Sequence, residues 1–366
     1  MRPIVIAAGG TGGHLFPAEA LAAELVRRGR RVALMTDARG AKNRSAAFEG
    51  REQFVLSGAG IAGRGAGRAA QAMGALAAGT WQARAILTRL DAAVIVGFGG
   101  FPCVAPVLAS RLLRRRPVIL LHEQNAVLGR ANRMLCRFAD RLALSFPETA
   151  RIPAGVPTLL TGNPVRPPIA ALAGGGYAPP AVEIRLLVLG GSLGARVFSE
   201  VVPPALALLP DALRRRLRVT QQCRAEDLDR VRDAYATCGI AAELAPFFAD
   251  VATLLRHAHL VIARAGASTV AELGVVGRPA ILVPLPGAID DHQAANARAL
   301  ADAGGAWVMP QANFEPGALA RQIEKLAADT GLLRAAAAKA AACGHADAAT
   351  RLADLVESYV LQESVP

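Results

Sequence analysis

The residues best suited to chemistry lie in residues 263–296, where an apolar run gives way to small and polar side chains. Residues 260–263 are all apolar and have the length of a strand. After the turn 264–267, Ser268 and Thr269 occupy the positions expected for the N-cap of a helix. A helix that begins there directs free N–H groups and the positive end of its dipole at the turn, where phosphate commonly binds. The segment therefore predicts an anion site.

A carboxylate and further polar side chains are expected around the same turn. Glu272 follows Ser268 by one helical turn, on the side facing the turn, where a carboxylate can bind ribose hydroxyls. The apolar run 280–286 predicts a second buried strand, and the polar residues 291–296 are expected to open the next helix and point back at the pocket. Because α/β sheets bind ligands at the carboxyl ends of their strands, we favour a site over an ordinary αβ unit with a tight turn.

Three glycine-rich turns, each directly after an apolar run, extend this pattern along the chain. They cover residues 9–14, 97–102 and 190–195. Glycine lets a backbone approach a ligand closely, and the first turn is neither a Walker loop nor a GxGxxG with a spaced acid. His14 ends that turn and is either a turn residue or a general base, because histidine exchanges protons near neutral pH. Pro17 is expected to open the following helix.

Polar side chains also follow the apolar strand that begins at Val118. His122, Glu123, Gln124 and Asn125 end it in a row, which has little rationale in packing, so we favour a site here too. Arg166, near the middle of the chain, is suited to neutralising a diphosphate.

These elements predict an α/β fold of two Rossmann-like, doubly wound parallel-sheet domains that face each other across a cleft. A length of 366 residues suits two domains, each with an ample core. The stretch 164–180 is rich in proline and glycine, and we place the domain boundary at its start. The first domain is then residues 1–163 with the C-terminal helix 347–366 packing back on it, and the second is residues 164–346.

Cysteine usage and the N-terminus indicate the compartment. The five cysteines are odd in number and have no CxxC spacing, which argues against a disulfide framework or a zinc site and for a reducing cytosol. The N-terminus enters a strand directly, so no signal peptide is expected. We therefore expect no metal and no redox cofactor.

The excess positive charge lies in the first half of the chain. Residues 1–163 hold 22 Lys and Arg against 9 Asp and Glu, whereas residues 164–366 hold 19 against 20. A basic half suggests an anionic partner. Nucleic acid is not favoured, because no binding motif is present and aromatic residues for base stacking are scarce. An anionic membrane surface is the other candidate.

Residues 69–83 are the segment most suited to a membrane surface. They carry no charge, include Met73, Leu76 and Trp81, and are flanked by arginines. The segment is shorter than the ~20 residues that span a bilayer, so no transmembrane helix is expected. It predicts either a helix lying on an anionic membrane or an ordinary alanine-rich core helix.

The second half has the features of a nucleotide site, and the basic first half suits an anionic acceptor. Together these favour group transfer from a nucleotide-activated donor. Helix N-termini would stabilise the leaving diphosphate, and His14 is the candidate base for the attacking hydroxyl. A nicotinamide-dependent oxidoreductase would need a GxGxxG with an acid about 20 residues further on, and neither is present in the right context. A non-catalytic nucleotide-sugar sensor remains a rival.

Six motifs occur in an order that resembles a known family. They are GGTGGHLFPA, GFGGFPCVAP, HEQNAVLGRANR, TGNPVR, GGSLGA, and ARAGASTVAE with GRPAILVPLP and DDHQAANA. Together they resemble the MurG family, in glycosyltransferase family 28, over essentially the whole chain. The resemblance implies a GT-B fold and inverting transfer of GlcNAc from UDP-GlcNAc to the C4 hydroxyl of the MurNAc of lipid I. The product would be lipid II, made for peptidoglycan at the inner face of the cytoplasmic membrane by a peripheral protein. The alternative is a GT-B enzyme that uses another lipid acceptor, such as diacylglycerol.

The resemblance also implies roles for individual residues, with UDP-GlcNAc as a substrate and no cofactor. The residues implied to bind the donor are Thr11, Gly12, Gly13, Asn125, Arg166, Ser192, Phe248, Ala267, Ser268, Thr269, Val270, Ala271, Glu272 and Gln293. On the acceptor side are Gly99, Gly100, His122 and Glu123, with His14 as the catalytic residue and Met73, Leu76 and Trp81 in a membrane patch. The usual pair of glutamines reads His292 and Gln293 here, a departure that concerns the sugar contacts rather than the reaction class.

Overall fold

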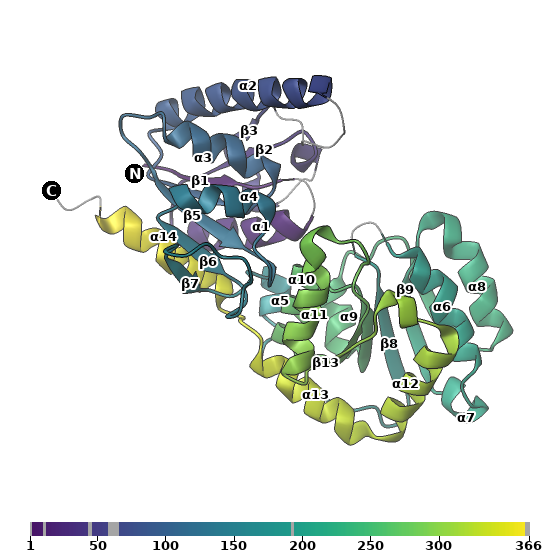
Figure 1. Ribbon diagram of the computed structural model, residues 1–366. Helices are drawn as coiled ribbons and strands as arrows, with labels where there is room; N and C mark the ends of the chain where they lie inside the picture. Colours follow the sequence, from purple (N-terminus) through teal and green to yellow (C-terminus); the bar gives the residue numbers. More distant parts are fainter. Residues whose placement is uncertain (1, 10–11, 43–45, 58–65, 192–193, 363–366) are drawn as a thin grey trace. The chain divides into compact units, whose positions relative to one another are not determined.

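The computed structural model describes residues 2–9, 12–42, 46–57, 66–191 and 194–362. The chain divides into two compact units (Figure 1). Unit 1 consists of Met1–Arg166 and Asp347–Pro366, and unit 2 is Pro167–Ala346. The division therefore follows Arg166, whereas the sequence placed it after residue 163.

Unit 1 is built on a seven-stranded parallel sheet with the order β3-β2-β1-β4-β5-β6-β7. The strands are β1 (Ile4–Ala7), β2 (Val32–Thr36), β3 (Gln53–Val55), β4 (Val94–Gly97), β5 (Val118–Glu123), β6 (Arg141–Leu144) and β7 (Thr158–Leu160). The order runs outward in both directions from the neighbours β1 and β4, so the sheet reverses its winding between them. Ligands of doubly wound sheets bind at the carboxyl ends of strands at such a point, and the first two glycine turns follow β1 and β4.

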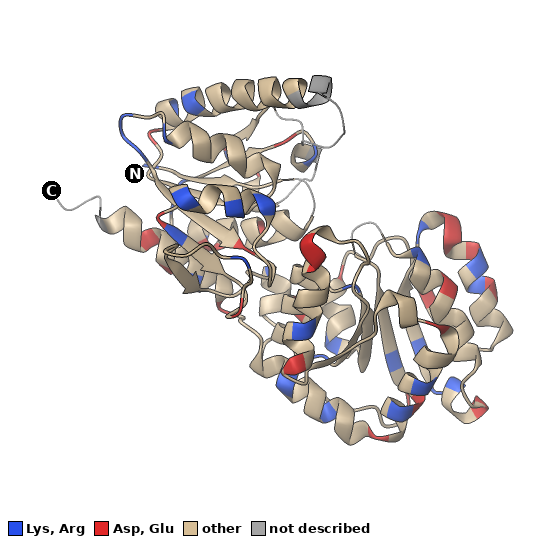
Figure 2. Cartoon of the chain, viewed as in Figure 1, with Lys and Arg blue, Asp and Glu red and all other residues tan. Residues whose placement is uncertain are grey.

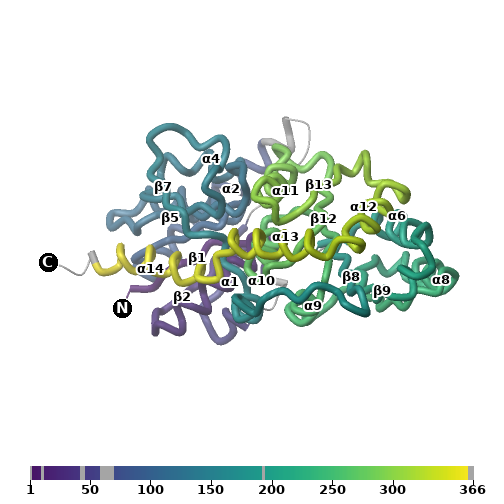
Figure 3. Tube along the Cα trace, turned by 90° about the horizontal axis from the view of Figure 1, so that it is seen from below, coloured from purple at the N-terminus to yellow at the C-terminus, as the bar shows by residue number. Residues whose placement is uncertain are grey.

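Helices cover both faces of this sheet because its central strands are apolar on both sides. Ile4 and Ile6 pack into one core cluster, and Val5 and Ala7 pack into the other. The helices of unit 1 are α1 (Gly12–Arg27), α2 (Ala66–Leu90), α3 (Val104–Ser110), α4 (Arg130–Leu135) and α14 (Ala348–Gln362). Helix α14 contributes to the same cluster as α1, and the two run side by side (Figure 3).

Two ion pairs fasten α14 to the end of α1. Arg28 Nη1 lies 2.6 Å from Asp354 Oδ1 and 2.7 Å from Glu357 Oε2. Leu352 and Val356 of α14 are fully buried. The C-terminal helix is therefore an integral part of the core of unit 1.

Helix α1 begins earlier than the sequence predicted. The expected first residue was Pro17, but the helix starts at Gly12 and contains the proline. A proline is tolerated near the start of a helix because its fixed φ is helical, although it removes one backbone hydrogen bond. Gly12 and Gly13 belong to the helix, so His14, which follows them, lies in its first turn.

Unit 2 contains a six-stranded parallel sheet with the order β10-β9-β8-β11-β12-β13. Its strands are β8 (Ile184–Leu189), β9 (Leu217–Gln222), β10 (Ala241–Ala245), β11 (Leu260–Ala263), β12 (Ala280–Leu282) and β13 (Ala306–Val308). Its helices are α5 (Pro167–Ala170), α6 (Arg196–Ala207), α7 (Asp211–Arg214), α8 (Leu228–Thr237), α9 (Val251–His257), α10 (Ala267–Val276), α11 (His292–Asp302), α12 (Pro316–Ala328) and α13 (Thr330–Ala342). The winding reverses between β8 and β11, whose carboxyl ends lead into the glycine turn at 190 and the turn at 264. Each unit is thus a Rossmann-like fold, and a chain of two such units is the composition that the predicted GT-B fold requires.

Candidate functional site

The turn between β11 and α10 has the features of an anion site, although its cap differs from the prediction. The N-cap is Gly266, with φ −64° and ψ 146°, and it has no side chain to bond the first-turn N–H groups. Ser268 and Thr269 were expected at the cap, and this was wrong, because they are the second and third residues of the helix and lie within its first turn. Ser268 Oγ is buried and has no hydrogen-bond partner among the residues that the structure describes. The start of α10 therefore keeps N–H and hydroxyl groups available to a ligand.

Glu272 and Asn296 lie close to this turn. Glu272 is buried on α10, four residues after Ser268 and on the same helix face. Asn296 on α11 is fully buried, and its Nδ2 donates to the Ala265 carbonyl at 3.1 Å. The start of α11 also shapes the neighbouring loop, since Gln293 Oε1 accepts a hydrogen bond from Leu285 N at 3.0 Å. His292 Nδ1 donates to the Ile289 carbonyl at 2.7 Å.

Arg264, at the start of this turn, holds the backbone around the predicted site, a role that the sequence reasoning missed. It is 9% exposed, and its Nη1 donates to the carbonyls of Val283 and Pro284 at 3.1 and 3.2 Å. Its Nη2 donates to Gln311 Oε1 at 2.6 Å, and the guanidinium lies 5.3 Å from the ring centroid of Phe198. Burial lowers the pKa of Arg264. The residue ties the end of β11 to the segment after β12, and an arginine directly after a buried strand was the available signal.

The glycine turn after β8 is held by a glutamine from β9. Gln222 Oε1 accepts from Gly190 N at 3.0 Å, and its Nε2 donates to the carbonyls of Gly191 and Pro246 at 3.0 and 3.1 Å. A Cβ atom at Gly190 would lie 2.4 Å from the Ala195 nitrogen, so this position requires glycine. Ser192 was predicted to bind the donor and lies outside the described residues. Phe248 is half-buried, in the loop that also contains Pro246.

In unit 1 the first two glycine turns meet around His14. Gly99 and Gly100 have φ of 79° and 69°, a conformation that favours glycine. Cβ atoms at these positions would lie 3.5 Å from His14 Cε1 and 3.4 Å from His14 Cδ2, respectively. The backbone of the second turn therefore packs along the imidazole. Gly12 and Gly13 form the first turn of α1 with His14, and Thr11 lies outside the described part of the chain.

The polar residues at the end of β5 have a packing role that the sequence did not reveal. Glu123 is 2% exposed. Its Oε1 accepts from the backbone N and the Nδ2 of Asn125, both at 3.0 Å, and its Oε2 accepts from Gly129 N and Asn132 Nδ2, both at 2.9 Å. One carboxylate thus fixes the loop that leads into α4. His122 is fully buried, and burial lowers its pKa to about 4.

Arg166 lies at the end of unit 1. Its guanidinium carbon is 4.8 Å from the ring centroid of Phe16 on α1, and the residue is half-buried. This contact orients the guanidinium near the helix that carries His14.

Helix α2 has one face in the core and another exposed. Ala83, Leu87 and Leu90 are buried, and Leu76 packs against the same cluster. Met73 and Trp81 are 70% and 67% exposed. Figure 2 shows few charges along α2, with basic residues toward its C-terminal end. The core interpretation thus holds for one face of this helix, and membrane contact of the exposed face stays a prediction. No helix in the described residues is long and apolar enough to cross a membrane.

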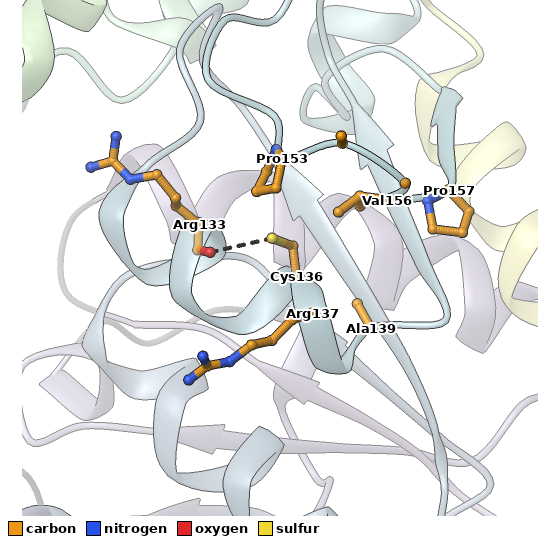
Figure 4. Close-up of a pocket in the computed structure, with 9 residues that line it drawn as sticks. Arg133, Cys136, Arg137, Ala139, Pro153, Val156 and Pro157 are labelled. Carbon is orange, nitrogen blue, oxygen red and sulfur yellow. Dashed lines mark hydrogen bonds between the residues drawn. The ribbon is translucent and has the colours of Figure 1, made fainter.

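A cavity of about 360 Å³ lies between α4 and the segment 153–157. None of the residues predicted for donor or acceptor lines it. In Figure 4 the guanidinium groups of Arg133 and Arg137 extend away from Val156 and Pro157, and Cys136 Sγ lies 3.3 Å from the Arg133 carbonyl. The cavity is therefore separate from the predicted site.

Comparison with known proteins gives matches over both units. The family model described as glycosyltransferase family 28 N-terminal domain matches residues 4–144, and that of the C-terminal domain matches residues 185–352. A protein of Granulibacter bethesdensis is 66% identical over 97% of this chain and 93% of its own length. It is named UDP-N-acetylglucosamine--N-acetylmuramyl-(pentapeptide) pyrophosphoryl-undecaprenol N-acetylglucosamine transferase. A protein of Acidiphilium cryptum with the same name is 56% identical over 99% of this chain and 98% of its own length.

Solved structures give a consistent result. The crystal structure of MurG from Acinetobacter baumannii has a TM-score of 0.80 and 31% identity, covering 98% of this chain and 100% of that one. The calicheamicin glycosyltransferase CalG4 has a TM-score of 0.66 at 19% identity, covering 100% of both chains, which shows a shared fold alone.

Proposed function

The chain belongs to glycosyltransferase family 28, and on this premise we propose that it transfers GlcNAc from UDP-GlcNAc to lipid I, forming lipid II. The observation that carries this proposal is the start of α10. Its uncapped N–H groups suit a diphosphate, and the buried Glu272 suits a ribose. The chain is also 66% identical to a protein named as an N-acetylglucosamine transferase. UDP-GlcNAc is a substrate, and we propose that no cofactor takes part.

In this reaction the C4 oxygen of the acceptor sugar forms a bond to C1 of GlcNAc as the bond from C1 to the diphosphate oxygen breaks. The electron pair leaves with UDP, and the proton of the hydroxyl passes to His14. Attack on the face opposite the leaving group inverts the configuration at C1. The dipole and N–H groups of α10 would stabilise the charge that gathers on the diphosphate.

The test is incubation of purified protein with UDP-GlcNAc and a lipid I analogue. We expect one UDP released for each disaccharide product formed. A parallel incubation with diacylglycerol examines the alternative acceptor, and we expect no product. Product from diacylglycerol alone would overturn the proposal.

We predict that Glu272→Ala raises the KM for UDP-GlcNAc about 10- to 100-fold, because a hydrogen bond to a charged group contributes about 1.5–3 kcal/mol. The measurement is initial rate against donor concentration at saturating acceptor. Glu324→Ala removes an exposed carboxylate of α12 and is the matched control, with an unchanged KM expected. An unchanged donor KM in Glu272→Ala would contradict a contact with ribose.

We also propose that unit 1 binds an anionic membrane surface, which would place the protein at the inner face of the cytoplasmic membrane. The exposed Met73 and Trp81 on α2 support this, as does the excess of basic residues in residues 1–163. Arg84 lies 5.1 Å from the Trp81 ring, so a cation and an apolar side chain are presented together.

We predict that the protein sediments with phosphatidylglycerol vesicles and that binding falls as salt rises, since the Debye length falls from ~30 Å at 0.01 M to ~3 Å at 1 M. The double substitution Met73→Ser with Trp81→Ser should weaken partitioning into the vesicles about 10-fold or more, because two apolar side chains no longer enter the interface. Val182→Ser, which alters a 79% exposed residue of unit 2, is the control. Vesicle binding that changes neither with salt nor with the double substitution would refute the proposal that α2 contacts the membrane.

A further inference from the structure

A chain of hydrogen bonds connects His14 to the backbone at Gly162 through two buried side chains. His14 Nδ1 lies 2.9 Å from Gln124 Oε1, Gln124 Nε2 lies 3.0 Å from His122 Nδ1, and His122 Nε2 lies 3.0 Å from the Gly162 carbonyl. His122 is fully buried and Gln124 is 1% exposed. All four residues belong to unit 1.

The direction of this chain is fixed at its far end. A carbonyl oxygen only accepts hydrogen bonds, so His122 Nε2 carries a hydrogen and donates it to Gly162. Burial holds the pKa of His122 at about 4, so the ring is neutral near pH 7 and its Nδ1 is an acceptor. Gln124 Nε2 therefore donates to that nitrogen.

A second hydrogen bond holds the amide of Gln124 in the same orientation. Its Nε2 also lies 3.0 Å from the backbone carbonyl of His122, so both amide hydrogens have acceptors. If the amide were flipped, Gln124 Oε1 would face the His122 carbonyl oxygen and the lone pair of His122 Nδ1. All three atoms are acceptors, and none of them would receive a hydrogen from the others. Gln124 Oε1 consequently faces His14, and His14 Nδ1 must donate to it.

We infer that Gln124 and His122 are positioning residues that hold His14 in the Nδ1–H tautomer, with the lone pair of Nε2 available to the acceptor hydroxyl. Free neutral histidine in water favours the opposite tautomer, in which Nε2 carries the hydrogen and cannot take a proton. This inference rests on the proposed function, because it gives His14 the role of base.

The surroundings of Nε2 are consistent with this assignment. A Cβ atom at Gly100 would lie 3.5 Å from Nε2, so the glycine leaves space beside the nitrogen. When Nε2 takes the proton, Nδ1–H keeps its bond to Gln124 Oε1, and no proton needs to move along the chain. The wrong tautomer of a catalytic histidine is known to cost about 10⁴-fold in kcat in a serine protease.

The first test is kinetic. Gln124→Leu should lower kcat about 10-fold or more and leave the KM for UDP-GlcNAc unchanged, since the base is misassigned while donor binding is retained. Gln124→Glu keeps an oxygen that accepts from His14 and should restore part of the loss. Ser110→Ala removes a different buried hydrogen bond in unit 1 and controls for stability, with wild-type kcat expected. A Gln124→Leu enzyme with wild-type kcat would overturn the inference.

The second test observes the tautomer directly and does not depend on activity. The chain has six histidines, and ¹⁵N-histidine labelling with long-range ¹H–¹⁵N spectra distinguishes Nδ1–H from Nε2–H in each. Signals that vanish in His14→Ala belong to His14. We expect Nδ1–H for His14 in the wild type and Nε2–H in Gln124→Leu.

The two tests separate this inference from the proposed function. If His14 shows Nε2–H in the wild type while His14→Ala still loses kcat, the positioning chain is overturned and the role of base stands. If His14→Ala keeps wild-type turnover, the role of base is overturned, and with it the catalytic purpose of the chain.

Discussion

Replacement of His14 by alanine should lower kcat by about 10²- to 10⁴-fold, the contribution typical of a positioned general base. His14 lies in the first turn of α1, with the second glycine turn along its ring and a defined hydrogen bond to Gln124. No other imidazole lies in this turn. UDP-GlcNAc should still bind with wild-type affinity, because the proposed ribose and diphosphate contacts are on α10 of unit 2.

The measurement is single-turnover product formation with donor and acceptor both saturating, together with calorimetric titration of UDP-GlcNAc. His257→Ala removes an exposed histidine of α9 and is the control, with unchanged turnover expected. Undiminished turnover in His14→Ala would remove this residue as the base. Loss of donor affinity along with kcat would instead indicate that His14 binds the donor.

Replacement of Arg278 by methionine should lower the free energy of unfolding of unit 2 by about 3–5 kcal/mol, because several buried carbonyls lose a charged donor. Arg278 is 6% exposed and directly follows the turn that ends α10. It donates to five backbone carbonyls at 2.7–3.2 Å, those of Gly176, Leu255, Arg256, Val276 and Gly277. Methionine has a similar length and apolar stem but donates no hydrogen bond.

A chain of two units need not unfold in one step, so the transition of unit 2 should be identified by its shift on adding UDP-GlcNAc. Arg278→Met should lower the midpoint of that transition in urea. Arg321→Met, on the exposed side of α12, should change it by no more than about 0.5 kcal/mol. Equal midpoints for Arg278→Met and the wild type would show that these carbonyls are satisfied in another way.

The parallel strands and the glycine turns could be predicted from the sequence because both signals are local. The bounds of β11 agree with the apolar run 260–263 that predicted it, β5 begins at Val118 as expected, and β8 ends directly before the third glycine turn. Buried parallel strands are continuous apolar runs, and a turn that passes close to a ligand or another backbone needs glycine. The family followed from six motifs in order, and the comparisons confirmed it.

The roles of individual polar side chains were less predictable because their partners are distant in sequence. Glu123 resembled a ligand-facing carboxylate, yet it accepts hydrogen bonds from Asn125, Gly129 and Asn132. The N-cap of α10 was predicted at Ser268 and Thr269 because their side chains can cap a helix. The actual N-cap, Gly266, has the extended backbone that any cap residue adopts, so its sequence carried no distinguishing signal. The residues that bind UDP-GlcNAc and lipid I stay predictions.

The packing of α14 on α1 has a consequence for biosynthesis. Residues 1–166 leave the ribosome before Leu352 and Val356, which complete the core beside Leu21 and Leu25. Domains usually fold as they emerge, starting from the N-terminus. Here the core of the nascent first unit stays incomplete, with an uncovered apolar stripe on α1, until the whole intervening unit has been synthesised.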